Sequence, residues 1–142
     1  MEDKKFDILK TEFLLTQQQM DKYDQLSMTI KAWAVTLWVA ASGWAFQSEK
    51  KEMFLLSVVL VCAFWFFDGI NKTFRTNYKN RRDKIATLLQ KEFRGEAFPA
   101  EESAPKLPPY SLKGTLSNSF LLHIALPYVI FLFLSLLFFF LK

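Results

Sequence analysis

The hydrophobic pattern divides the chain into three apolar blocks separated by polar segments. The last block, 119–141, is a run of 23 residues without a formal charge when His123 is neutral. A bilayer core of about 30 Å needs roughly 20 apolar helical residues, so this block is long enough to cross alone. The other two blocks, 32–46 and 53–67, are each 15 residues long and are joined by a short polar turn. They predict a helical hairpin that spans if flanking lysines snorkel.

We therefore expect an all-α membrane protein with three transmembrane helices. A buried hairpin in a soluble domain is the alternative, but Trp33 and Trp44 lie near the two ends of the first block, where indoles favour the membrane interface. The apolar blocks and the polar segments between them divide the chain into five expected segments. They are a polar helix continuous with the first span (1–31), the hairpin (32–69), a basic helix (70–94), a Pro-rich linker (95–118) and the third span (119–142).

The basic residues predict the orientation. Fifteen of the eighteen Lys and Arg lie in 1–31 and 70–118, which three crossings place on the same side of the membrane. By the positive-inside rule this side is cytoplasmic. We expect a multi-pass membrane protein with its N-terminus in the cytoplasm and its C-terminus outside.

The front segment is expected to continue the first span as one helix. Neither Pro nor Gly occurs before Gly43, so nothing obliges the helix to stop at the membrane surface. Apolar residues recur at alternating spacings of three and four, interrupted by Thr16 and Ser27, which is typical of a surface that packs on another helix. The apolar positions are Phe6, Leu9, Phe13, Met20, Tyr23 and Ile30.

The segment 70–94 is strongly basic, with eight basic and two acidic residues. Near the membrane end, Lys72 and Arg75 are expected to be headgroup anchors. Further along, four basic residues either pair with the acidic front helix or bind an anionic ligand such as a nucleotide, because clustered cations attract phosphate. These four are Lys79, Arg81, Arg82 and Lys84.

Small residues on the first span predict a close helix–helix interface, with a second copy of the chain as one candidate partner. The candidate residues are Ala32, Thr36, Ala40 and Gly43. The third span is rich in Phe and is expected to face lipid. Its phenylalanines include Phe131, Phe133, Phe138, Phe139 and Phe140.

Three residues are candidates for gating or for a hinge: Asp68, His123 and Pro127. Asp68 at the end of the second span is either an interfacial cap or an ion contact at a pore mouth. Pro127 removes the N–H that would bond the carbonyl of His123, which predicts a kink. His123 is expected to be a polar interfacial anchor, with pH sensing as the alternative.

Chemistry-bearing residues are sparse. Cys62 is the single cysteine, and the pattern holds neither a metal-ligand spacing nor a nucleophile with its base. We therefore expect no catalytic residues, no cofactor and no metal, and no sequence-specific binding of nucleic acid.

The stretch MDKYDQLSMTIKAWAVTLWVAASGW, followed by a tight hairpin and the basic helix FRTNYKNRRDKIATLLQKEF, resembles the SLATT-type family of small bacterial membrane effectors over about residues 10–94. The resemblance implies a homo-oligomeric effector that permeabilises the inner membrane when a cytoplasmic partner signals infection or stress, as in antiphage defence. The expected partners are the lipid bilayer, further copies of the chain, and a cytoplasmic protein or nucleotide-type activator. The chain differs from the two-span pattern of that family in its linker and third span. The alternatives are a non-conducting scaffold that recruits a cytoplasmic partner and a subunit of a larger membrane complex.

Overall fold

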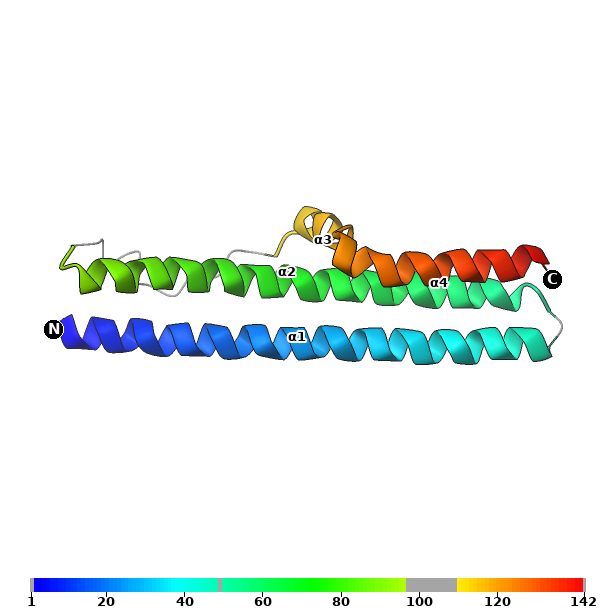
Figure 1. Cartoon of the computed structure of the whole chain (residues 1–142), viewed down its shortest axis with the longest axis horizontal. Coiled ribbons are helices and arrows are strands. Elements are labelled where there is room, and N and C mark those ends of the chain that lie inside the picture. Colours follow the sequence, from blue (N-terminus) through cyan, green and yellow to red (C-terminus); the bar gives the residue numbers. More distant parts are fainter. Residues whose placement is uncertain (1, 49, 97–109, 142) are drawn as a thin grey trace. The chain divides into compact units, whose positions relative to one another are not determined.

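The computed structural model describes residues 2–48, 50–96 and 110–141. These residues form an all-helical protein, in the order α1 (Glu2–Gln47), α2 (Met53–Phe93), α3 (Leu112–Ser119) and α4 (Leu122–Leu141). Both α1 and α2 are continuous ribbons in Figure 1. This continuity agrees with the scarcity of Gly and Pro in the two segments.

Contacts divide the chain into two compact units, to both of which α1 and α2 contribute. The polar unit comprises Met1–Asp24 and Phe74–Tyr110, and the apolar unit comprises Gln25–Thr73 and Ser111–Lys142. The apolar unit therefore holds both α3 and α4.

In the polar unit, α1 packs on α2 through a small apolar core. Leu9 is fully buried against Ile85 and Leu88, with Phe13 packed beside them. Nearer the other end of the unit, the ring of Tyr23 stacks on Phe74 at a centroid distance of 6.0 Å. The expected packing positions of the front helix thus lie on the side of α1 that faces α2.

In the apolar unit, three helices share a core. Ala34 of α1, Val61 of α2, and Ile124 and Tyr128 of α4 are buried together, surrounded by partly buried aromatic and leucine side chains. The inward positions of α4 recur at spacings of four and three, which is the spacing of a packed helix face. They are Ile124, Tyr128, Phe131, Ser135 and Phe138.

Two helices are long and apolar enough to cross a membrane, α2 and α4. Only 28% of the most apolar window of α2 and 17% of that of α4 are buried within the chain. The core helix of a soluble protein would be mostly covered, so this exposure favours a membrane as the missing neighbour. In the described residues α1 does not meet the same criterion, so the first of the three expected spans, 32–46, is not confirmed.

The ends of the expected linker differ from the sequence prediction. Gly95, with a φ of 70°, follows the last turn of α2, and the N–H of Glu96 donates to the carbonyl of Lys91 at 3.0 Å, as in a Schellman cap. Residues 112–118, predicted to belong to the Pro-rich linker, instead lie in α3, whose first turn is capped by the Ser111 hydroxyl. The remaining part of the predicted linker, 97–109 with its four prolines, lies outside the described residues.

Because α3 ends at Ser119 and Phe120 caps it, the third apolar helix begins at Leu122 and not at residue 119. Pro127 is the sixth residue of α4, beyond the four N-terminal positions whose N–H groups have no acceptor in the helix, so it removes the N–H that would bond the His123 carbonyl.

Candidate functional site

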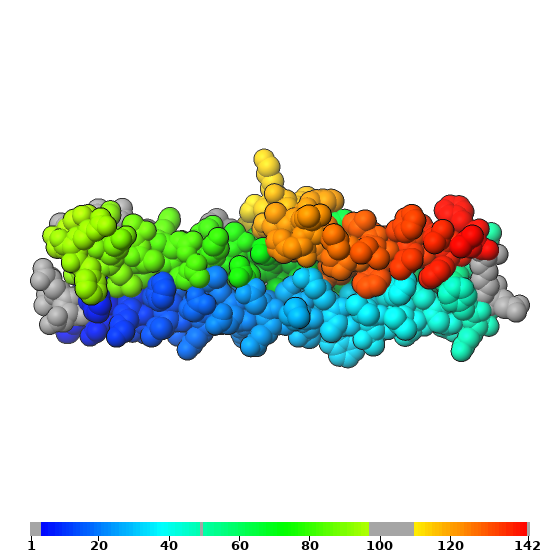
Figure 2. All heavy atoms as spheres, viewed as in Figure 1, coloured from blue at the N-terminus to red at the C-terminus, as the bar shows by residue number. Residues whose placement is uncertain are grey.

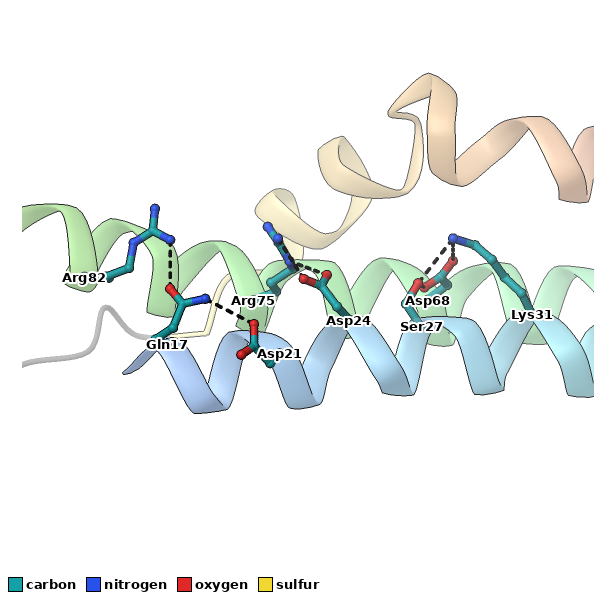
Figure 3. Close-up of polar contacts among 8 residues, drawn as sticks. All are labelled: Gln17, Asp21, Asp24, Ser27, Lys31, Asp68, Arg75 and Arg82. Carbon is teal, nitrogen blue, oxygen red and sulfur yellow. Dashed lines mark hydrogen bonds and ion pairs between the residues drawn. The ribbon is translucent and has the colours of Figure 1, made fainter. Parts of the chain in front are cut away.

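The most distinctive polar group of the apolar unit surrounds Asp68, whose side chain is only 1% exposed. Its Oδ1 accepts a hydrogen bond from the Ser27 hydroxyl at 2.7 Å. Its Oδ2 accepts from the Tyr128 hydroxyl at 3.3 Å and lies 3.5 Å from Lys31 Nζ. Three helices, α1, α2 and α4, thereby converge on one carboxylate. Figure 3 shows Ser27 and Lys31 of α1 reaching toward Asp68 of α2.

The geometry makes this group a structural ion pair. A buried carboxylate without a partner costs several kcal/mol, and the Lys31 ammonium offsets its charge while two hydroxyls satisfy its oxygens. Lys31 also donates to Ser27 at 3.2 Å, so the four side chains form one network. The interfacial cap expected at Asp68 is therefore replaced, in the folded chain, by a buried junction between helices.

A second polar network fixes α4 deeper in the apolar unit. The indole N–H of Trp38 donates to Ser135 Oγ at 2.8 Å, and Ser57 Oγ donates to the same oxygen at 2.9 Å. Hydrogen bonds between helices are an important source of specificity where both helices are surrounded by lipid. This network sets the register of α4 against α1 and α2.

One side of the third apolar helix, which as a whole was expected to face lipid, is packed against α1 and α2. Phe131 packs on Trp38 at a centroid distance of 4.9 Å, and Phe138 contacts Phe46 at 5.2 Å. On the opposite side Phe133 and Phe140 are exposed.

In the polar unit, arginines of α2 pair with carboxylates and an amide of α1. Arg81 makes a bidentate pair with Glu12, at 2.7 and 2.8 Å, and both side chains are largely buried. Arg82 Nη1 donates to Gln17 Oε1 at 3.1 Å, and Arg82 also pairs with Asp83. Figure 3 shows Arg82 directed at Gln17.

Of the two expected headgroup anchors, Arg75 forms a bidentate pair with Asp24, which is half-exposed. This hydrogen bond raises the pKa of the Arg75 guanidinium. Lys72 lies about one turn earlier in α2, within the apolar unit, and is partly exposed. Close by in the polar unit, burial raises the pKa of the Tyr23 phenol, and the neighbouring Tyr78 raises it further.

The four basic candidates for ligand binding therefore divide into two pairs. Arg81 and Arg82 are engaged with the front helix, as one of the two sequence hypotheses expected. Lys79 and Lys84 are exposed, and neither makes an ion pair with the residues that the structure describes.

The small residues proposed for a helix–helix interface, Ala32, Thr36, Ala40 and Gly43, are all exposed. A Cβ added at Gly43 would meet nothing within 4 Å. The alanines that α1 buries within the chain lie on another face of the helix. They are Ala34, Ala41 and Ala45. His123 is exposed at the start of α4.

Sequence reasoning missed the partners of Asp68 and the serine network. Ser27 was interpreted as an interruption of the packing surface, and Lys31 as a snorkelling residue. A signal was present for α4, because Tyr128 and Ser135 stand seven residues apart in an otherwise apolar helix and so share one face.

Among the described residues, no group of three or more His, Cys, Asp or Glu side chains is placed to hold a metal ion. Comparisons of the chain with family models, with curated proteins and with solved structures give no match.

Proposed function

We propose that the protein is a homo-oligomeric effector of the bacterial inner membrane that forms a pore or perturbs the bilayer in response to a cytoplasmic signal. The observation that carries the proposal is that α1 and α2 each run without a break through both units. A change in the packing of the polar unit can therefore bias the same two helices within the membrane.

The proposed topology has three crossings. α2 and α4 have the length and composition of spans, and the 15-residue block 32–46 of α1 crosses beside α2 as the other arm of the hairpin. The block is short for a bilayer, and Lys50 and Lys51 beyond its C-terminal end supply the snorkelling side chains, while Lys31 at its other end is held by Asp68. The N-terminus is then cytoplasmic and the C-terminus outside.

A conducting path, in this proposal, forms between copies. The centre of the apolar unit is filled by Ala34, Val61, Ile124 and Tyr128, so a single copy is packed where a channel would run. The exposed stripe of Ala32, Thr36, Ala40 and Gly43 suits close contact between helices of neighbouring copies.

The polar unit is the proposed receiver of the signal. Its helix pair is held mainly by arginine–carboxylate pairs and a small apolar core, which an anionic or protein activator can rearrange at modest free energy. Lys79 and Lys84 are exposed cations of this unit, and we take them as the candidates for first contact with an anionic activator.

A second candidate function is a non-conducting scaffold, and a groove on α1 favours it. The groove has a volume of about 420 Å³ and is lined by Asp7, Ile8, Thr11, Glu12 and Leu15. Exposed Ile8 and Leu15 with the neighbouring Asp7 suit a partner segment that carries apolar and basic side chains.

Induced expression in bacteria loaded with a membrane-potential dye separates the two functions. A pore predicts depolarisation that the substitution Gly43→Leu abolishes and the matched control Val35→Leu, at an exposed site on α1 outside this stripe, leaves intact. Unchanged polarisation and growth on expression of the natural chain, even with the neighbouring gene products present, would contradict the pore and leave the scaffold.

A further inference from the structure

The short helix α3 has an inverted polarity. Its hydroxyl-bearing residues Thr115 and Ser119 are buried, at 0% and 6% exposure. Its large apolar residues face outward instead: Leu112 is 64% exposed and Leu116 is 55% exposed, and the capping residue Phe120 is 69% exposed. A helix in water normally turns these two classes of side chain the other way.

The polar face of α3 is used for docking within the apolar unit. Thr73 Oγ1 of α2 donates to Thr115 Oγ1 at 3.2 Å and accepts from Asn118 Nδ2 at 3.1 Å. The carbonyl of Ser119 accepts the indole N–H of Trp65 at 2.8 Å. These contacts hold α3 in one orientation, so its apolar face is directed outward by the fold.

A glycine makes this docking possible. A Cβ at Gly69 of α2 would lie 1.8 Å from Ser119 Oγ and 3.0 Å from Ser119 Cβ. The side chain of Ser119 at the end of α3 thus occupies the space that a Cβ at position 69 of α2 would need.

The outward apolar residues of α3 form a stripe that is followed by exposed apolar residues at the start of α4. Leu112, Leu116 and Phe120 are four residues apart, and Leu122 and Leu126 follow as exposed residues of α4. In the space-filling view α3, in yellow to orange, lies uncovered at the surface directly beside the start of α4 (Figure 2). Lys113 is exposed on the same helix and is the cation nearest to this stripe in sequence.

We propose that α3 is an interfacial helix that inserts Leu112, Leu116 and Phe120 among the lipid acyl chains, at the boundary with the headgroups. The occupant is the bilayer because the stripe is continuous with the exposed face of a helix that has the composition of a span. Lys113 then reaches the lipid phosphates, and Trp65 lies at the depth that indoles favour. The inference rests on the membrane placement in the proposed function, and not on conduction.

The test uses the full chain with Cys62→Ser, reconstituted in vesicles of three parts phosphatidylcholine to one part phosphatidylglycerol. A nitroxide is attached through a single cysteine at Leu116 or, as the matched control on the same helix, at exposed Ser117. Labels at Leu126 and Lys79 serve as references for lipid and water. Collision rates with oxygen, which partitions into lipid, and with a water-soluble nickel chelate report the depth of each label.

The proposal predicts that the label at Leu116 collides with oxygen nearly as often as the label at Leu126 does, and is protected from nickel. The label at Ser117 should be several times more accessible to nickel than the one at Leu116. Nickel accessibility at Leu116 equal to that at Lys79 would overturn the proposal, and so would protection of Leu116 from both reagents, which would indicate a covering protein. Depolarisation by the same labelled chains is measured in parallel, so a failure of the pore is distinguished from a failure of this inference.

Discussion

The polar and apolar units use the same two helices, yet different interactions hold them together. In the polar unit, charged pairs such as Arg81–Glu12 and Arg75–Asp24 join α1 to α2 around a few apolar side chains. In the apolar unit, small and aromatic residues pack with α4, and hydroxyl and indole groups replace the charged pairs except at Asp68. The interactions that join α1 to α2 therefore differ between the polar and the apolar unit.

The carboxylates of Glu12 and Asp68 make the contrast between the two units sharper. Glu12 meets the planar fork of Arg81, with two matched hydrogen bonds. Asp68 meets a flexible lysine and two neutral hydroxyls, and its charge is compensated at a longer distance of 3.5 Å. We therefore expect the stability of the Asp68 junction to depend on Lys31, Ser27 and Tyr128 together. The stability of the Glu12 pair should depend on Arg81 alone.

The largest effect is expected for Lys31→Met. The substitution leaves the 1%-exposed carboxylate of Asp68 without its cation and should lower stability by about 3 kcal/mol. Thermal unfolding in detergent, followed by circular dichroism, measures the loss, and Lys50→Met in the exposed turn is the control. The double variant Lys31→Met with Asp68→Leu should recover much of the loss. If the single variant unfolds like Lys50→Met, the buried ion pair has no stabilising role.

Next in size is Gly69→Ala, which removes the close approach of α3 to α2. The added methyl group would overlap Ser119, and the required shift should destabilise the docked state by about 1–3 kcal/mol. Disulfide formation between cysteines at Thr73 and Thr115, whose hydroxyls are 3.2 Å apart, reports the docking. The yield should fall in Gly69→Ala and rise again when Ser119→Gly is added. An unchanged yield would show that α3 does not depend on this contact.

In the polar unit, Arg81→Ala should have an intermediate effect. It leaves Glu12 largely buried without its bidentate partner, at a cost of about 2 kcal/mol. Hydrogen exchange of the α2 amides around Ile85 should accelerate, while the amides around Val61 in the apolar unit keep their protection. Equal acceleration in both units would contradict their separate stabilisation.

The smallest effect is expected for Arg75→Gln, because the paired Asp24 side chain is 53% exposed. The loss should stay below about 1 kcal/mol and disappear at high salt, where exposed pairs are screened. The same hydrogen-exchange measurement at low and at high ionic strength checks this. A loss that persists at high salt would mean that the pair is better shielded than its exposure indicates.

The sequence was sufficient for the helical class, for the helix continuity and for several packed positions, because these follow from local properties. The absence of Pro and Gly before Gly43 predicted the unbroken α1, and the spacing of Leu9, Phe13 and Met20 predicted the side that packs. The pairing of Arg81 with the acidic front helix was one of two expected arrangements, because opposite charges on adjacent helices attract.

The sequence did not predict which residues far apart in the chain contact each other. Asp68 and Ser27 are 41 residues apart, and Trp38 and Ser135 are 97 apart, so only the packing of three helices brings them together. α3 was missed because its residues Ser111, Gly114, Asn118 and Ser119 resemble a loop in composition. The helix is stabilised by its cap and by contacts with Thr73, and not by intrinsic propensity.

The central claim is that α1 crosses the membrane between the polar unit and the turn after Gln47. Single cysteines at Gln18 and Ser48, in a chain with Cys62→Ser, are treated with a membrane-impermeant maleimide on intact and on opened bacterial cells. The account predicts labelling of Ser48 in intact cells and labelling of Gln18 only after the inner membrane is opened. Labelling of both positions under the same condition would contradict the account.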